Sequence, residues 1–163
     1  MLRARNAVFD ACRPGADWRA LHLLANTAVL EDLTKAGLLQ GSVDQMMEVN
    51  LAGRLLQPHG LGHFMGCDVH DVGGYLEGHP EKSPLPGLRG LRTARILEPN
   101  MVLTIEPGCY FIDVLIDKAL KDDEINKYID EAGRSAIVDF FFDVRCACKE
   151  STRFRNILAI TAL

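Results

Sequence analysis

The sequence predicts a domain of mixed α/β (α+β) class, on three observations. The first third of the chain carries apolar residues at helical spacing, a glycine-rich stretch begins at Pro58, and a short β-branched run follows at 102–106. The chain has 163 residues, of which 48% are hydrophobic and 25% charged. This length and composition are those of a globular domain with a core of its own.

Three helices are expected before the glycine-rich stretch. The first covers 2–11. The second begins after Asp17, a residue type favoured at helix N-caps, and continues to about residue 36, where Gly37 provides a stop. Its apolar residues recur every three or four positions, as on one buried helix face. A third, short helix is expected over 43–51.

The chain changes character after Pro58. Glycines weaken a helix by about 1 kcal/mol each, so the glycine-rich residues 58–78 are expected to be extended chain and turns. A surface loop is expected over 77–86, a strand over 102–106 and a second strand over 109–112. The mixed charges of 117–130 are typical of an exposed helix or loop.

Composition excludes several classes of partner. The formal net charge is −4, so there is no electrostatic reason to expect nucleic acid binding. No apolar run approaches the length that a membrane span needs, and the N-terminus lacks the pattern of a signal peptide. The five cysteines form no CxxC pair. A reduced, cytoplasmic setting is therefore expected.

Three of the five histidines lie within the glycine-rich stretch. His59 and His63 share a face if the chain between them is extended, whereas the turns before His70 leave its direction open. With Asp68 and Asp71 nearby, these imidazoles could bind a divalent metal or perform acid–base catalysis near neutral pH. The alternative is that they only form hydrogen bonds within a glycine-rich turn. Glycines lower the stability of the fold, so their number in this stretch needs another reason, which favours the functional interpretation.

Glu106 is a second candidate site residue, because it ends an apolar strand just before Pro107 and Gly108. A carboxylate buried alone in this position is costly, and a cation or a paired charge would remove that cost. The alternative is an ordinary strand-end glutamate in solvent.

Three segments together resemble a known family. They are PHGLGHFMGCDVHDVGGY at 58–75, PGLRGLRTAR at 86–95 and LEPNMVLTIEPGCYF at 97–111. These segments resemble the pita-bread metallopeptidases, and among them the prolidases (Xaa-Pro dipeptidases). The resemblance implies a partial pita-bread fold, with helices packed on a curved, mainly antiparallel sheet. It covers 1–125, which would form a partial metallopeptidase domain, and leaves 126–163 as a divergent tail.

The resemblance also implies a role for each candidate residue. In this family two divalent ions, commonly Mn²⁺, activate a water that attacks the scissile carbonyl. His63 and Glu106 match metal ligands of the family. His59 and His70 match histidines of the catalytic site; His59 also lines the substrate site, and His70 donates a hydrogen bond to the reacting carbonyl. Arg92 matches the arginine that binds the carboxylate of the C-terminal proline.

The family pattern is incomplete in this sequence. The resemblance implies five protein ligands, and the sequence supplies two of them. Two aspartates would precede the helix at 2–11, and a glutamate would follow a stretch like Arg155-Asn156, yet no glutamate occurs after Glu150. One glutamate and one histidine leave most of the charge of two divalent cations unmatched, so tight binding of two metals is not expected from this chain alone.

Two functions of different class are therefore expected. The first is a metallodipeptidase for Xaa-Pro dipeptides, impaired by the missing ligands or completed by a partner chain. The second is a catalytically inactive, truncated isoform or fragment that binds another subunit, such as a full-length relative. The resemblance to prolidases also implies a homodimer.

Overall fold

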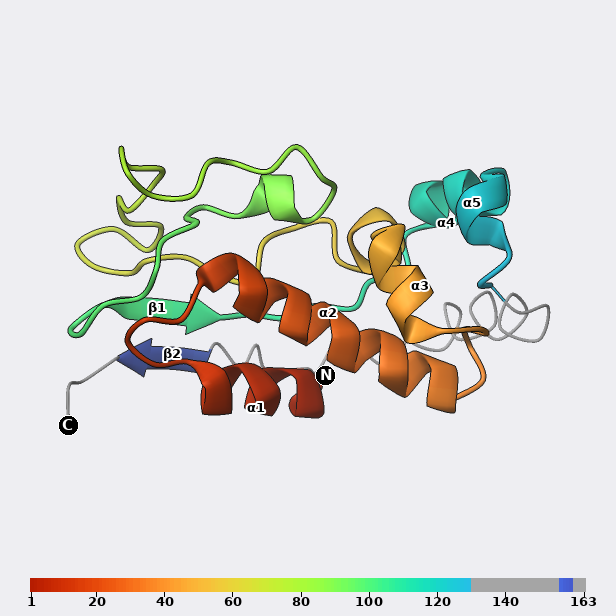
Figure 1. The fold of residues 1–163 in the computed structure, drawn as a ribbon, viewed down its shortest axis with the longest axis horizontal. Coiled ribbons are helices and arrows are strands. Elements are labelled where there is room, and N and C mark those ends of the chain that lie inside the picture. The colour runs from red at the N-terminus through yellow and green to blue at the C-terminus, as the bar shows by residue number, and fades with distance from the viewer. Residues whose placement is uncertain (130–155, 160–163) are drawn as a thin grey trace.

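The structure is a computed structural model that describes residues 1–129 and the strand at 156–159. The first third is mainly helical, and the loops that follow it lead into the sheet (Figure 1). The elements in chain order are α1 (Leu2–Ala11), α2 (Trp18–Lys35), α3 (Val43–Glu48), the π-helix η1 (Ala52–Leu56), the 3₁₀-helix η2 (Leu88–Gly90), β1 (Val102–Ile105), α4 (Asp113–Leu120), α5 (Asp123–Asn126) and β2 (Asn156–Ala159).

The expected helices are present. The α1 helix has the predicted bounds. The Asp17 carboxylate accepts a hydrogen bond from the Arg19 backbone N–H at 2.8 Å and caps α2, and Gly37 follows the helix with a φ of +74°. The α3 helix is shorter than predicted, because Asn50 takes a positive φ of 53° and the π-helix η1 begins at Ala52. No helix among the described residues is long and apolar enough to cross a membrane.

The sheet is small and antiparallel. Strand β1 pairs with β2, with Val102 opposite Ala159 and Ile105 opposite Asn156. The glycine-rich segment lies along the other edge of β1, where Phe64 and Leu103 form an isolated antiparallel bridge. The α1 helix packs against α2 and contacts β1, and the ribbon shows both helices beside the strand pair (Figure 1).

The predicted strand at 109–112 was wrong. These residues form no strand, and α4 begins immediately afterwards at Asp113. The Tyr110 N–H donates to the carbonyl of Leu56 at 2.8 Å, while Cys109 and Phe111 pack against the core. A β-branched and aromatic composition favours a strand only where a neighbouring strand offers a full ladder, and here the segment pairs with the end of the π-helix at one point.

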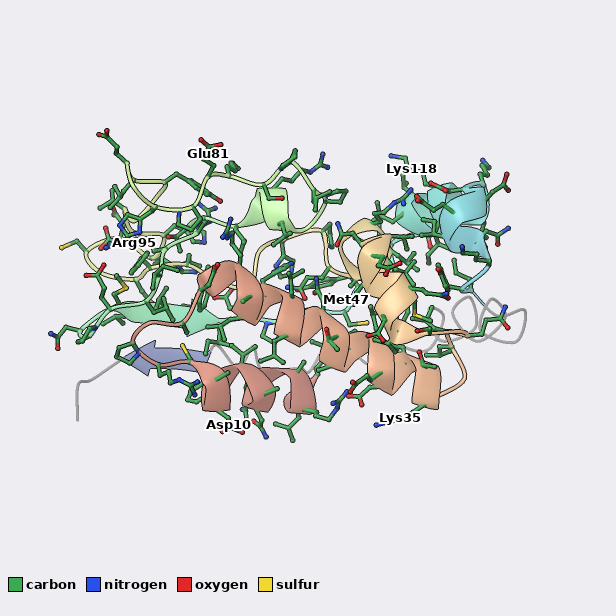
Figure 2. The ribbon with its side chains drawn as sticks, in the orientation of Figure 1. Asp10, Lys35, Met47, Glu81, Arg95 and Lys118 are labelled. Atoms are coloured by element: carbon green, nitrogen blue, oxygen red, sulfur yellow. The ribbon has the colours of Figure 1, made fainter. Side chains whose placement is uncertain are left out.

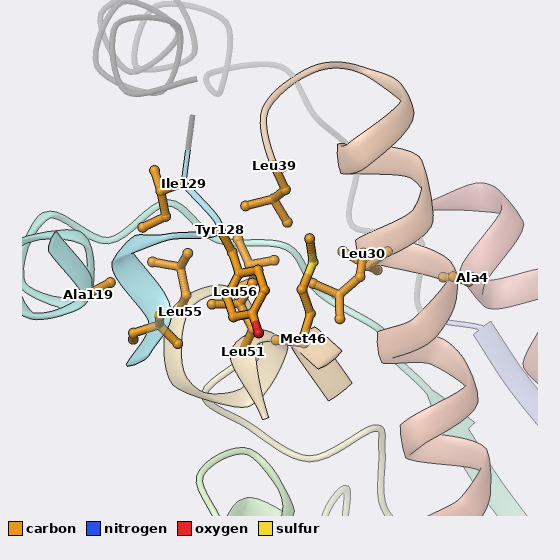
Figure 3. Close-up of a cluster of buried hydrophobic side chains, with 14 residues drawn as sticks. Ala4, Leu30, Leu39, Met46, Leu51, Leu55, Leu56, Ala119, Tyr128 and Ile129 are labelled. Atoms are coloured by element: carbon orange, nitrogen blue, oxygen red, sulfur yellow. The ribbon is translucent and has the colours of Figure 1, made fainter. Parts of the chain in front are cut away.

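Two clusters of buried apolar side chains form the core. One lies between α2, α3, η1 and the α4–α5 region, with Leu30, Met46 and Tyr128 among its members (Figure 3). The other packs beneath the glycine-rich segment and includes Trp18, Leu61, Leu103 and Ile105. The second cluster contains Leu61, and Phe64 packs against it, so it holds the chain on either side of His63.

Candidate active site

The backbone of the glycine-rich segment runs antiparallel to β1. The Met65 N–H donates to the Val102 carbonyl at 3.1 Å, and the Thr104 N–H donates to the His63 carbonyl at 2.9 Å. The Glu106 N–H donates to the Leu61 carbonyl at 2.6 Å. In this register His63 is opposite Thr104 and diagonal to Glu106, so the two candidate ligands lie on the same face.

The close approach of the two backbones explains why residue 62 is a glycine. A Cβ atom on Gly62 would lie 1.9 Å from the carbonyl oxygen of Thr104, a distance that no side chain tolerates. The glycine therefore allows the segment to lie against β1 with His63 beside Glu106. This agrees with the expectation that the glycine-rich chain is extended and turning rather than helical.

All five residues predicted for the site line one cavity. Its volume is about 370 Å³, and His59, His63, His70, Arg92 and Glu106 all contribute to its wall. Three different parts of the chain supply them: the glycine-rich segment, the loop after η2 and the end of β1. The tertiary structure thus brings together residues that are up to 47 positions apart in the sequence, from His59 to Glu106.

His63 and Glu106 contact each other in the cavity. His63 is 4% exposed, and its Nδ1 lies 2.8 Å from the Phe64 carbonyl, which can only accept, so Nδ1 carries a proton. The other ring nitrogen, Nε2, lies 3.4 Å from Oε1 of Glu106. In a neutral imidazole Nε2 is an acceptor, so two acceptors then face each other. This Glu106 oxygen is buried and has no hydrogen-bond partner among the described residues.

The arrangement fits a cation between the two side chains. A divalent metal accepts lone pairs from both imidazole nitrogen and carboxylate oxygen, and a backbone carbonyl on the far nitrogen of the histidine is a common support for such a ligand. Protonation of the histidine would also satisfy the contact. Within the described residues, no group of three or more His, Cys, Asp or Glu side chains is placed to hold a metal ion.

His59 has a partner that the sequence did not indicate. Its Nδ1 lies 2.7 Å from the Gly60 carbonyl and therefore carries a proton, so Nε2 accepts the hydrogen bond of the Tyr110 hydroxyl at 3.0 Å. The two rings meet edge to face with centroids 5.2 Å apart. Tyr110 also lines the cavity, although the sequence assigned it only to a strand. No spacing signal could have found it, because the contact depends on the chain turning after Gly108.

His70 is brought back to His63 by the intervening turns. Their ring centroids are 4.3 Å apart and the ring planes are inclined by 78°. Arg92 lines the same cavity from the loop after η2 and is exposed to solvent. Both side chains are exposed and line the cavity: a guanidinium suits the binding of an anionic group, and an imidazole suits the donation of a hydrogen bond.

Another histidine, His22, lies in the buried face of α2 and was missed by the sequence reasoning. It is fully buried, and the side-chain amide of Asn26 lies 3.2 Å from its Nε2. Burial lowers its pKa from 6.5 to about 4, and the charge of nearby His59 acts in the same direction. His22 is therefore a neutral part of the packing behind the site.

The chain belongs to metallopeptidase family M24, whose model matches residues 1–162. The Xaa-Pro dipeptidase of Rattus norvegicus is 58% identical over 122 residues, which cover 75% of this chain and 24% of the rat protein. The Homo sapiens Xaa-Pro dipeptidase is 57% identical with the same coverage. The probable Xaa-Pro aminopeptidase PEPP of Coccidioides posadasii is 36% identical over 144 residues, or 88% of this chain and 29% of that protein. The chain thus spans about a quarter of the length of these curated relatives.

Solved structures confirm the predicted fold class. The aminopeptidase PepP of Pseudomonas aeruginosa matches with a TM-score of 0.54 and 33% identity over 70% of this chain and 23% of that one. Zinc-substituted Escherichia coli aminopeptidase P in complex with product matches with a TM-score of 0.54 and 34% identity over 68% of this chain and 22% of that one. These neighbours have the pita-bread fold, and the present chain contains part of it. The resemblance to prolidase is likewise confirmed.

Proposed function

We propose that this chain carries part of the active site of a metal-dependent dipeptidase that hydrolyses Xaa-Pro dipeptides. The observation that supports it best is the contact between His63 Nε2 and the buried Oε1 of Glu106, at 3.4 Å inside a cavity that also holds the other predicted residues. The similarity to rat and human Xaa-Pro dipeptidases supports the substrate class.

His63 and Glu106 are the proposed metal ligands, and Mn²⁺ is the proposed metal. When bound, a pair of divalent ions would lower the pKa of a water molecule and polarise the scissile carbonyl. The proposed role of Phe64 is to hold the His63 ring through its carbonyl, so that Nε2 keeps its lone pair toward the cavity. The remaining ligands of a two-metal site would come from residues outside this pair, in a longer chain or a partner chain.

The other cavity residues are proposed to bind and orient the peptide. Arg92, at the mouth, binds the proline carboxylate through a bidentate pair of N–H groups. His70 donates a hydrogen bond to the carbonyl as it becomes tetrahedral. His59 lines the substrate site, and the Tyr110 hydroxyl holds its ring in one tautomer.

The proposed organisation follows the sequence resemblance. Residues 1–125 form the partial metallopeptidase domain, and 126–163 are a divergent tail. The β2 strand falls within that tail and pairs with β1. A cytoplasmic location is proposed from the cysteine pattern, and a homodimer or an association with a full-length relative from the family resemblance.

One observation favours a second function. Because the described residues offer no group of three metal-ligating side chains, the chain could be a catalytically inactive, truncated isoform that binds another subunit. In that case the cavity would be present but would not catalyse hydrolysis.

The experiment that separates these functions measures metal content and Gly-Pro hydrolysis after incubation with Mn²⁺. The parent chain is compared with His63→Ala and with a control, His79→Ala, a change in the loop outside the cavity. Bound metal and turnover that only His63→Ala loses would support the dipeptidase. A folded chain that neither binds metal nor hydrolyses the dipeptide would show that this chain alone does not complete the site, and would favour the inactive subunit-binding module.

A further inference from the structure

Three buried polar side chains behind the candidate active site have incomplete hydrogen bonding. His22 and Asn26 lie one turn apart on α2, and Gln57 follows the π-helix η1, two residues before His59. Each of the three is at most 1% exposed. Four of their atoms have no hydrogen-bond partner among the described residues: Nδ1 of His22, Oδ1 of Asn26, and Oε1 and Nε2 of Gln57. We call His22, Asn26 and Gln57 the polar cluster.

The residues of the polar cluster meet around Gly87. The side-chain amide of Asn26 lies 3.2 Å from Nε2 of His22. A Cβ atom on Gly87 would lie 3.4 Å from the same nitrogen and 3.0 Å from the backbone carbonyl oxygen of Gln57. The loop before η2 therefore closes the space where α2 and the end of η1 come together. In Figure 2, α2 continues from this region to Lys35, so the cluster belongs to the N-terminal half of the helix.

Turning the side-chain amides does not supply the missing partners. If the Asn26 amide is turned by 180°, its oxygen faces His22 and its nitrogen is left over instead. Turning the Gln57 amide exchanges two atoms that both lack a partner. Leaving several buried amide and imidazole atoms unpaired would cost a large share of the net stability of a domain. Buried polar atoms are nearly always paired with protein or with ordered water, so a further binding partner is expected here.

The chemistry of the four atoms selects the kind of partner. Because the Asn26 amide donates to Nε2, the neutral His22 ring carries its proton on Nδ1. The polar cluster thus presents N–H donors on His22 and Gln57 and oxygen acceptors on Asn26 and Gln57. A cation would satisfy only the oxygens, and an anion would satisfy only the N–H groups. A water molecule both donates and accepts, and a buried water typically makes about three hydrogen bonds to such groups.

We infer that the polar cluster binds at least one internal water molecule, and that this hydration site holds Gln57 and thereby positions His59 in the cavity wall. Only Pro58 separates the two residues, and its ring fixes one of the backbone dihedral angles between them. His59 lines the cavity and presents Nε2 to the Tyr110 hydroxyl. Gln57 is thus a positioning residue that acts through His59, and neither part of the inference requires a bound metal.

The first measurement detects the water in the parent chain, labelled with ¹⁵N and free of added metal. Nuclear and rotating-frame Overhauser spectra are recorded between the water resonance and the side-chain N–H protons. A water that stays bound while the protein tumbles gives cross-peaks of opposite sign in the two spectra, whereas proton exchange with solvent gives the same sign. We expect opposite signs at the Gln57 amide and at His22 Nδ1–H. The internal control is the exposed amide of Gln40, which donates to the Lys127 carbonyl at 3.1 Å and should not show this pattern.

The second measurement tests the positioning of His59. Gln57→Met keeps the length of the side chain and removes its amide, so the water cross-peak at His22 should be lost. The ring nitrogen shifts of His59 should move away from the single Nδ1–H tautomer that its contacts favour, toward the mixture found in free histidine. The matched control Gln40→Met should keep both signals. Asn26→Leu, which removes another partner of the water, should likewise remove the cross-peak at the Gln57 amide.

Each result decides one part of the inference. A folded parent chain without the opposite-sign cross-peaks at Gln57 and His22 would overturn the hydration site, whether or not the variants fold. Cross-peaks in the parent together with an unchanged His59 tautomer in folded Gln57→Met would overturn the positioning role. Circular dichroism of each variant verifies the fold. Because no metal or peptide is added, these outcomes do not depend on the dipeptidase proposal.

Discussion

The buried imidazole of His22 makes the stability of this chain depend on pH. Its pKa falls from 6.5 to about 4 because burial removes the charged form from water, with a smaller effect of His59. The unfolded chain therefore takes up a proton between these two values while the folded chain does not. Stability is full above the unfolded pKa of 6.5, is lost as the pH falls toward 4, and changes no further below it.

The magnitude follows from the size of the shift. Each pKa unit corresponds to about 1.4 kcal/mol, so moving from about pH 7 to about pH 4.5 should lower the free energy of unfolding by about 2 kcal/mol through His22 alone. Protonation would also place an N–H on Nε2 against the amide of Asn26, which donates to that atom at 3.2 Å in the structure. The two donors would then repel each other.

The assay is urea denaturation followed by circular dichroism at both pH values. His22→Gln removes the titrating group, and the difference between the two pH values should shrink by about 2 kcal/mol relative to the parent. The matched control is Leu21→Ala, which alters a side chain 5% exposed in the same helix and contains no titratable group. It should lower stability at both pH values and keep the pH difference. An unchanged pH difference in His22→Gln would refute the argument.

Three further predictions concern other parts of the structure. Gly62→Ala should destabilise the chain by about 3 kcal/mol or more in urea denaturation, because its Cβ would lie 1.9 Å from the Thr104 oxygen; parent-like stability would contradict this register. Asp17→Ala should lower the free energy of unfolding by about 1 kcal/mol through loss of the α2 cap, and an equal loss in Asp17→Asn would show that charge rather than capping matters. Burial raises the pKa of Cys109 to about 11, so mass spectrometry near pH 8 should find iodoacetamide on exposed Cys67 well before Cys109; the reverse order would contradict the packing.

Local sequence signals determined the helices and the nature of the glycine-rich segment. Asp17 and Gly37 mark the ends of α2 because capping and positive φ are properties of a few neighbouring residues. The motifs around His63 and Glu106 likewise indicated the family, which the comparison with M24 confirms. These signals depend on the order of residues along a short stretch, so they can be interpreted without knowing where the chain goes next.

Only the tertiary structure decided what the remaining segments do. The segment after Gly108 has the composition of a strand, yet it meets η1 and places Tyr110 against His59, because strand formation depends on a partner that composition does not specify. The burial of His22 was equally hidden, since a lone histidine in a helix shows its surroundings only once the facing loops are packed. The site itself combines both levels: sequence supplied its residue types, and the pairing of residues 61–65 with β1 set the 3.4 Å contact between His63 and Glu106.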